Sequence, residues 1–313
     1  MTAGPRSRHV LATSALMLLA LVAAACGDGG ERAAGGSGRA RVVATTNILG
    51  DVVANLVGDE AEVVVILPPN TDPHDFALSP QQARSMREAD LLVVNGLGFE
   101  ESLLDALDAA QAEGVALYEA TSAIEAIPPD EDGGDGGDPH FFTDPVRMAQ
   151  VTADLSRTLV EEVGLQSGAV ERNTDRYLAA LGLLDEDIRS RLAEVPPQQR
   201  KLVTNHDVFA YFAARYDLRV VGTVIPASTT LAEPGAAGLS ELAETLRGEG
   251  VRAIFTDASA GDRLAEALAG ELGGPVEVVP LFTESLGPEG SGGATYLEMM
   301  RTNAERIADA LGG

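Results

Sequence analysis

Cysteine is almost absent from this chain of 313 residues: Cys26 is its single copy, so no disulfide can form within the chain. Basic residues are also scarce, with 22 lysines and arginines against 48 aspartates and glutamates, a formal net charge of −26. Nucleic-acid binding requires basic patches, so we expect no nucleic-acid partner. Beyond the first 26 residues no apolar run is long enough to span a membrane. We therefore expect a soluble, monomeric body of about 270 residues.

The N-terminus has the pattern of an export signal. A positively charged start precedes the apolar run Val10–Ala25, which at about 15 residues suits a signal sequence better than a membrane span. Small residues lead into Cys26, as in a bacterial lipobox, where the thiol is acylated; secretion with a free cysteine is the alternative. We predict a signal peptide over residues 1–25 and a lipid-anchored flexible linker over 26–40, rich in glycine and alanine.

The rest of the chain alternates short β-branched runs with amphipathic stretches, which predicts a parallel α/β architecture. We expect an N-terminal lobe over residues 41–166 and a C-terminal lobe over 196–313, each of (β/α)4 type. The expected strands are Arg41–Thr45, Glu62–Leu67, Leu91–Asn95, Ala116–Glu119, Lys201–Thr204, Arg219–Ile225, Ala253–Thr256 and Val276–Leu281. The expected helices between them are Ile48–Val57, Pro80–Ala89, Ser102–Ala112, Val208–Arg215, Leu239–Gly248, Arg263–Leu272 and Thr295–Leu311, with another near Pro145.

A single long helix is expected between the two lobes. Apolar residues recur at three-, four- and seven-residue steps from Val170 to Leu192, and the pair Pro196-Pro197 follows. This pattern predicts a linking helix within 167–195, about 40 Å long, which is enough to run the length of both lobes.

Three histidines remain beyond residue 26, and each lies close to an aspartate and a phenylalanine. The three motifs are Thr71-Asp72-Pro73-His74-Asp75-Phe76, Gly137-Asp138-Pro139-His140-Phe141-Phe142 and Thr204-Asn205-His206-Asp207-Val208-Phe209. Imidazole is the commonest protein ligand for transition metals, and three imidazoles with one carboxylate form a four-coordinate zinc site. Three unrelated surface or capping histidines are the alternative interpretation.

The predicted strands suggest where these histidines meet. His74 and His206 each follow a strand, one in each lobe, and the ligand crevice of an open α/β sheet lies at the carboxyl ends of its strands. The site is therefore expected in the cleft between the lobes. A fourth ligand is expected from Glu284, directly after the last strand, with Asp257 as the second choice. The position of His140 is not fixed by this argument.

These segments resemble the substrate-binding proteins of bacterial ABC importers for zinc and manganese, the cluster A-I (cluster 9) family. The resemblance extends from about Arg41 to the C-terminus and rests on four motifs in order: Leu67–His74, Asp138–Phe141, Thr204–Asp207 and Thr283–Gly287. It implies two lobes joined by a rigid helix, a buried metal between them, and delivery to a membrane permease with its ATPase subunits. An extracytoplasmic zinc chaperone is a candidate supplier of the ion. One position departs from the family pattern, because Glu284 stands where aspartate is usual.

The third ligand bears on the choice of metal. Members devoted to manganese usually have glutamate there and zinc importers have histidine, so His206 assigns this chain to the zinc-type subgroup by resemblance. Imidazole suits Zn²⁺, whereas Mn²⁺ prefers oxygen ligands. A manganese or mixed receptor is the alternative. The acidic stretch Pro128–Asp138, which lacks the histidines common there in zinc importers, is either a solvated loop or a weak collector of cations.

A zinc-dependent hydrolase is the rival from another functional class. Such a site has three protein ligands and an open position, and the chain has no His-Glu-x-x-His or His-x-His pair. The segment Gly96-Leu97-Gly98 is too short for a dinucleotide-binding loop. We therefore expect a binding protein and no enzymatic activity. A pure adhesin or scaffold lipoprotein is a third interpretation.

Overall fold

Two four-stranded parallel sheets organise the computed structural model, which describes residues 1–2, 38–128, 136–232 and 235–312. The first sheet has the order β2-β1-β3-β4 and the second β6-β5-β7-β8, so both have the same strand arrangement. The strands are β1 (Ala40–Ala44), β2 (Ala61–Val65), β3 (Leu91–Val94), β4 (Ala116–Glu119), β5 (Lys201–Thr204), β6 (Arg219–Thr223), β7 (Ala253–Asp257) and β8 (Glu277–Leu281). The predicted fold class, two parallel α/β lobes, is confirmed.

Helices follow nearly every strand. They are α1 (Asn47–Val57), α2 (Pro80–Arg87), α3 (Leu104–Ala112), α4 (Pro145–Glu161), α5 (Ser167–Ala193), α6 (Ala210–Tyr216), α7 (Ala236–Glu249), α8 (Arg263–Leu272) and α9 (Tyr296–Gly312). Three starts differ from the sequence prediction by two residues or more. Helix α3 begins two residues later than expected, because Glu101–Leu103 forms a short 3-10 helix before it. Helix α6 begins two residues later than expected, because the N–H of Val208 closes a turn onto the carbonyl of His206. Helix α7 begins three residues earlier, with Gly235 as its N-cap.

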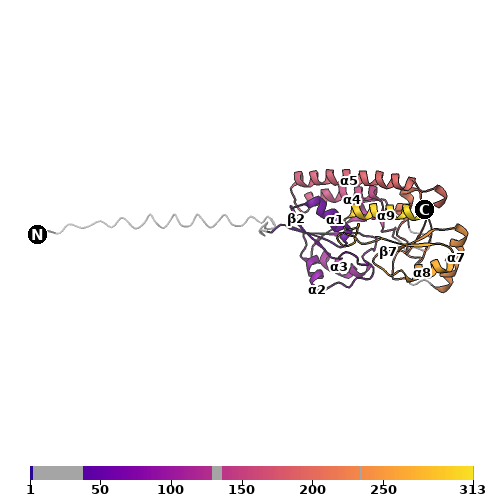
Figure 1. The fold of residues 1–313 in the computed structure, drawn as a ribbon. Helices are drawn as coiled ribbons and strands as arrows, with labels where there is room; N and C mark the ends of the chain where they lie inside the picture. Colours follow the sequence, from indigo (N-terminus) through magenta and orange to yellow (C-terminus); the bar gives the residue numbers. More distant parts are fainter. Residues whose placement is uncertain (3–37, 129–135, 233–234, 313) are drawn as a thin grey trace. The chain divides into compact units, whose positions relative to one another are not determined.

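The long helix α5 joins the two lobes in sequence and lies along the helices α4, α1 and α9, on the side of them away from the strands (Figure 1). Its buried face has the predicted apolar side chains, from Val170 through Tyr177 and Leu184 to Leu192, and its C-cap is Glu194, just before the proline pair. The other helices in contact with α5 include α1 and α4 from the first lobe and α9 from the C-terminus. The helix thus provides a common support for both lobes.

The apolar core is shared between the lobes on one side of the sheets and divided on the other. One buried cluster includes Val42 of β1, Leu184 of α5, Phe255 of β7 and Met300 of α9. The opposite faces have separate clusters, one around Met86 under α2 and α3, the other around Leu246 under α7 and α8. Because buried apolar area is the main source of stability, the shared cluster resists separation of the lobes on the α5 side.

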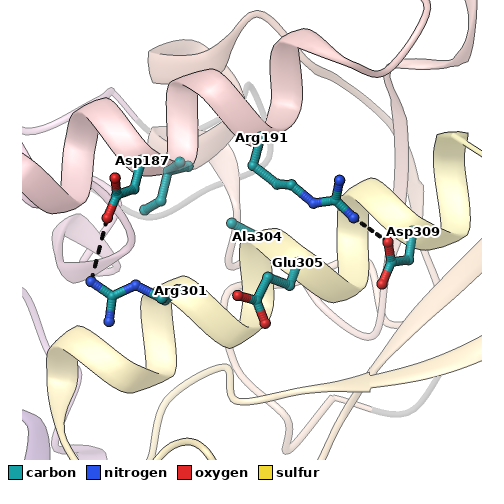
Figure 2. Close-up of a pocket in the computed structure, with 7 residues that line it drawn as sticks. Asp187, Arg191, Arg301, Ala304, Glu305 and Asp309 are labelled. Carbon is teal, nitrogen blue, oxygen red and sulfur yellow. Dashed lines mark hydrogen bonds and ion pairs between the residues drawn. The ribbon is translucent and has the colours of Figure 1, made fainter.

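A surface groove of about 450 Å³ lies between α5 and α9, and Figure 2 shows the side chains that line it. Two ion pairs cross it: Arg191 with Asp309, and Arg301 with Asp187 at 3.5 Å. Exposed pairs of this kind contribute at most about 1 kcal/mol each, so the helix contact depends mainly on the apolar side chains beneath them. This groove contains none of the histidines.

Several predicted features lie outside the described residues. These are the signal peptide, Cys26, most of the linker and the acidic stretch between residues 129 and 135, and all of them stay predictions, as do the domain boundaries. Among the helices that the structure does describe, none combines the length and the apolar character needed to cross a membrane.

Candidate metal centre

The three histidines and Glu284 come together in one buried cluster. Their side chains offer ligand atoms that all lie within 4.8 Å of one another. His140 and His206 are completely buried, and His74 and Glu284 are each 3 % exposed. Residues 74 and 284 are therefore neighbours in space although 210 positions separate them in the chain. The cluster lies where the two lobes meet, as the strand-end argument predicted.

The two Asp-Pro-His segments adopt the same local turn. The N–H of His74 donates to Oδ1 of Asp72 at 2.8 Å, and the N–H of His140 donates to Oδ1 of Asp138 at 2.8 Å. An aspartate that bonds the backbone two residues further on is an Asx turn, and the intervening proline restricts the chain to that shape. The repeated sequence motif thus has a structural cause: each turn projects one imidazole into the cluster.

Each turn is also anchored to the sheet behind it. The helix that follows His74 begins with a capping box, in which Ser79 accepts from the N–H of Gln82 at 3.3 Å. The Gln82 side chain also donates to the carbonyl of Ile66 at 2.7 Å, which ties the start of α2 to the end of β2. On the other turn, the side chain of Asn95 at the end of β3 donates to the carbonyl of Pro139 at 2.9 Å.

His206 and Glu284 are positioned from the second sheet. His206 follows β5, where its carbonyl accepts from the hydroxyl of Thr204 at 2.7 Å. Glu284 follows β8, and the side chain of Asn303 in α9 bonds both the N–H and the carbonyl of Phe282, at 2.9 and 2.7 Å. Two short backbone anchors therefore hold these two ligand candidates close to the ends of their strands.

The carboxylate oxygen Oε1 of Glu284 lies among three imidazole nitrogens. Its distances to Nε2 of His74, His140 and His206 are 2.9, 3.0 and 3.2 Å. In a tetrahedral zinc site with metal–ligand distances of about 2.0–2.1 Å, neighbouring ligand atoms are about 3.3 Å apart. The three oxygen–nitrogen distances are close to that spacing, and all four ligand atoms lie within 4.8 Å of one another. Three neutral imidazoles and one carboxylate would hold one small divalent ion.

The electrostatics of the cluster favour charge on the Glu284 carboxylate and protons on the rings of His74 and His140. Burial by itself would raise the pKa of Glu284, but His206, His140 and His74 together hold it well below its ordinary value. Burial by itself would lower the pKa of His140, but hydrogen bonds to Asp138 and Glu284 raise it to about 10. The pKa of His74 is raised as well, by Glu284 against the effect of burial. A metal ion competes with these protons for the same nitrogens.

Several buried polar atoms in the cluster lack a hydrogen bond. Among the described residues these include Nδ1 of His74, both ring nitrogens of His206, and Oε2 of Glu284. A buried polar atom without a partner costs about 1–3 kcal/mol, so such atoms are rare unless a ligand satisfies them. A bound cation would satisfy Nε2 of His206 and the second carboxylate oxygen, so the residues present fit a metal.

Asp257, the second choice for a fourth ligand, lies outside the cluster. It is buried at the end of β7, where its carboxylate accepts from Thr283 and Ser259. Burial raises the pKa of Asp257, and the charge of Glu284 raises it further. Of the two acidic candidates, Glu284 is the one beside the histidines.

Two phenylalanines cover the rings. Phe99 contacts His74 and His140 edge-on, with ring centroids 5.5 and 5.7 Å apart, and Phe142 contacts His140 at 5.9 Å. Both side chains are almost fully buried. An apolar shell of this kind limits access of water to a metal and lowers the local dielectric.

Sequence reasoning missed the residues that tie the lobes together beside the cluster. Oδ2 of Asp72 accepts from the hydroxyl of Thr230 at 2.6 Å, and Asn47 bonds Ser285 at 2.8 Å. For Asn47 a signal existed: the polar run Thr45–Asn47 stands between the apolar residues of β1 and those of α1. Nothing in the sequence pointed to Thr230.

Comparison with known proteins places these features in a family. Residues 42–310 match the family model described as zinc-uptake complex component A, periplasmic (ZnuA). The chain is similar to the manganese-binding lipoprotein MntA of Halalkalibacterium halodurans, with 28 % identity over 95 % of this chain and 96 % of that protein. It is also similar to MntA of Bacillus subtilis, with 29 % identity over 87 % of this chain and 89 % of that one.

Among solved structures, the fold matches the periplasmic zinc binding protein TroA from Treponema pallidum. The TM-score is 0.80 at 24 % sequence identity, with 88 % of this chain and all of that chain covered. At this identity the match concerns the fold, and the family model covers nearly the whole described body. The chain therefore belongs to the family of the periplasmic zinc-uptake component ZnuA.

Proposed function

We propose that this protein is the substrate-binding component of a metal ABC importer, which captures one Zn²⁺ ion as cargo and passes it to a membrane permease driven by ATPase subunits. The observation that carries the proposal is the convergence of three imidazole nitrogens on the carboxylate of Glu284. Membership of the family and relatives named as metal-binding lipoproteins support it. The same names support an extracytoplasmic, lipid-anchored protein, with Cys26 as the acylated residue.

A receptor explains the cluster better than a hydrolase does. Catalytic zinc keeps one position open for water, whereas His74, His140, His206 and Glu284 together fill a four-coordinate sphere. The burial of all four side chains also leaves little room for a substrate at the ion. The family consists of metal-uptake receptors, which agrees with the expectation that the protein is not an enzyme.

The choice of zinc depends on the donor atoms. Three nitrogens and one carboxylate suit Zn²⁺, and Mn²⁺ prefers a set richer in oxygen. Manganese is the second candidate, because the two relatives from Halalkalibacterium and Bacillus are named manganese-binding. The second oxygen of Glu284, Oε2, has no hydrogen-bond partner among the residues that the structure describes, and it would supply a fifth donor to a larger ion.

Direct competition between the two metals tests this choice. We expect the purified, metal-stripped protein to take up close to one Zn²⁺ per chain and to retain it against an excess of Mn²⁺, as measured by elemental analysis after dialysis. The matched variant is His206→Glu, which replaces a nitrogen donor with oxygen and should shift preference toward Mn²⁺. Equal or weaker binding of zinc by the unmodified protein contradicts the zinc assignment.

A further inference from the structure

The segment 285–296, which follows Glu284, is hydrogen-bonded to the first lobe at both of its ends. At one end, Ser285 and Leu286 meet Asn47, the first residue of α1. At the other end, the N–H of Tyr296, where α9 begins, donates to Oδ2 of Asp51 at 3.1 Å. Asn47 and Asp51 are one helical turn apart and lie on the same side of α1. The segment 285–296 therefore spans from one polar side chain of this helix to the next.

Asn47 makes the closest of these contacts. Its side-chain amide donates to the hydroxyl of Ser285 at 2.8 Å and to the carbonyl of Pro68 at 3.0 Å. Its oxygen accepts the N–H of Leu286 at 2.7 Å. Asn47 is 6 % exposed, so these bonds form away from solvent, where losing a partner is costly.

The backbone that leads to His74 joins the same network. The N–H of Thr71 donates to the hydroxyl of Ser285 at 3.1 Å, and the N–H of Asn70 donates to the carbonyl of Leu286 at 2.8 Å. Asn70 has a φ of 59°, a left-handed conformation that asparagine tolerates better than most residues. One amide side chain thus links the chain before His74 to the chain after Glu284.

From this network we infer that Asn47 is a positioning residue for Glu284. It does not touch the four candidate ligands; it fixes Ser285 and Leu286, and through them the direction of the glutamate carboxylate. The inference rests on the proposed metal-binding function. It also means that Glu284, although it follows a strand of the second sheet, is held in register with His74 and the first lobe. Groups that hydrogen-bond a metal ligand directly typically contribute about 10- to 100-fold in affinity, and Asn47, which acts through the residue next to the ligand, is expected at the lower end of that range.

A double-mutant cycle tests the inference. The four proteins are wild type, Asn47→Ala, Glu284→Ala and the double variant, with Zn²⁺ affinity measured against a chromogenic chelator. We expect Asn47→Ala to weaken binding about tenfold in the wild-type background. In the Glu284→Ala background we expect a change of no more than about twofold, because the residue through which Asn47 acts is missing.

The control on the same helix is Asn55→Ala, since Asn55 is exposed and its side chain bonds only the carbonyl of Asp51. Its affinity should equal that of wild type. Thermal unfolding of the metal-free proteins identifies any variant that is not folded. Should Asn47→Ala not fold, Ser285→Ala takes its place in the cycle, because it removes the hydroxyl that Asn47 bonds.

The outcomes are distinguishable. Equal weakening by Asn47→Ala in both backgrounds, or none in the wild-type background, overturns the positioning role while leaving metal binding intact. If wild type holds no metal, or Glu284→Ala binds as tightly as wild type, the proposed site itself is wrong, and the positioning role falls with it.

Discussion

The two Asp-Pro-His turns have the same sequence and the same backbone hydrogen bond, yet their aspartates do different things. Oδ1 of Asp138 accepts two hydrogen bonds from His140. One comes from the backbone N–H and the other from the ring Nδ1–H, at 2.7 Å. Oδ1 of Asp72 accepts only the N–H of His74, and its Oδ2 bonds Thr230 in the other lobe. Within the described part of the chain, the ring of His74 has no hydrogen-bond partner at Nδ1.

This difference assigns separate physical roles to two identical motifs. With Nδ1–H directed at a carboxylate, His140 presents the lone pair of Nε2 to the cluster and becomes a stronger ligand. The ring of His74 has no such contact with Asp72, but Asp72 bonds Thr230 and so joins the two lobes. We conclude that one turn sets the strength of a ligand and the other helps to hold the lobes together over the site.

Removing each imidazole is the largest perturbation of this pair. His140→Ala and His74→Ala should each weaken Zn²⁺ binding by about a hundred- to a thousandfold, because four-ligand structural zinc sites typically bind with about 10–16 kcal/mol, so that one ligand of four accounts for a few kcal/mol. The two variants should differ when metal is absent. His140→Ala leaves Asp138 without its ring partner and should lower the melting temperature more than His74→Ala does. Chelator competition and calorimetry of the metal-free proteins measure the two effects. Equal losses of metal-free stability would contradict the difference between the turns.

The sequence predicted the lobes, the strands and the linking helix because these depend on local patterns of apolar residues. The side chains from Val170 to Leu192 recur with helical spacing, and the helix they form is the observed α5. Strand ends also located His74 and His206, since the carboxyl edges of parallel strands are where ligands gather.

The connections across the lobes could not be predicted in this way. The contact between Asp72 and Thr230 joins residues 158 positions apart, and that between Asn47 and Ser285 joins residues 238 positions apart. No periodicity relates such residues; only the packing of the two lobes against each other brings them together. The direction of the Asp138 carboxylate was equally hidden, because the same Asp-Pro-His sequence gives two different arrangements.

The next largest effect is expected from neutralising the aspartate of each turn, Asp138 or Asp72. Asp138→Asn should weaken Zn²⁺ binding about 10- to 100-fold, the usual range for a carboxylate that orients a ligating histidine. Asp72→Asn should cost no more than about threefold, since asparagine still accepts the N–H of His74 and still bonds Thr230. The same chelator competition measures both variants. Equal losses of zinc affinity in the two variants would mean that the negative charge near the ion strengthens binding and that the hydrogen bond from Asp138 to the His140 ring does not.

The smallest expected effect concerns Asp51, a third aspartate that accepts a backbone N–H but faces no histidine. Burial raises its pKa above the ordinary value of 3.8, and the N–H of Tyr296 offsets this only in part. A raised carboxyl pKa means that the folded state prefers the protonated form, so stability from this group is greatest below pH 3.8 and falls as pH rises through the folded-state value.

Asp51→Asn keeps the acceptor for Tyr296 and removes the charge. We therefore expect the variant and wild type to have similar free energies of unfolding near pH 4, and the variant to be the more stable at pH 7, as measured by urea denaturation at both values. Zinc affinity should stay within about twofold of wild type, because no imidazole depends on this carboxylate. A loss of affinity as large as that of Asp138→Asn would mean that neutralising any buried aspartate disturbs the site. In that case the hydrogen bond between Asp138 and the His140 ring would not explain the difference between the two turns.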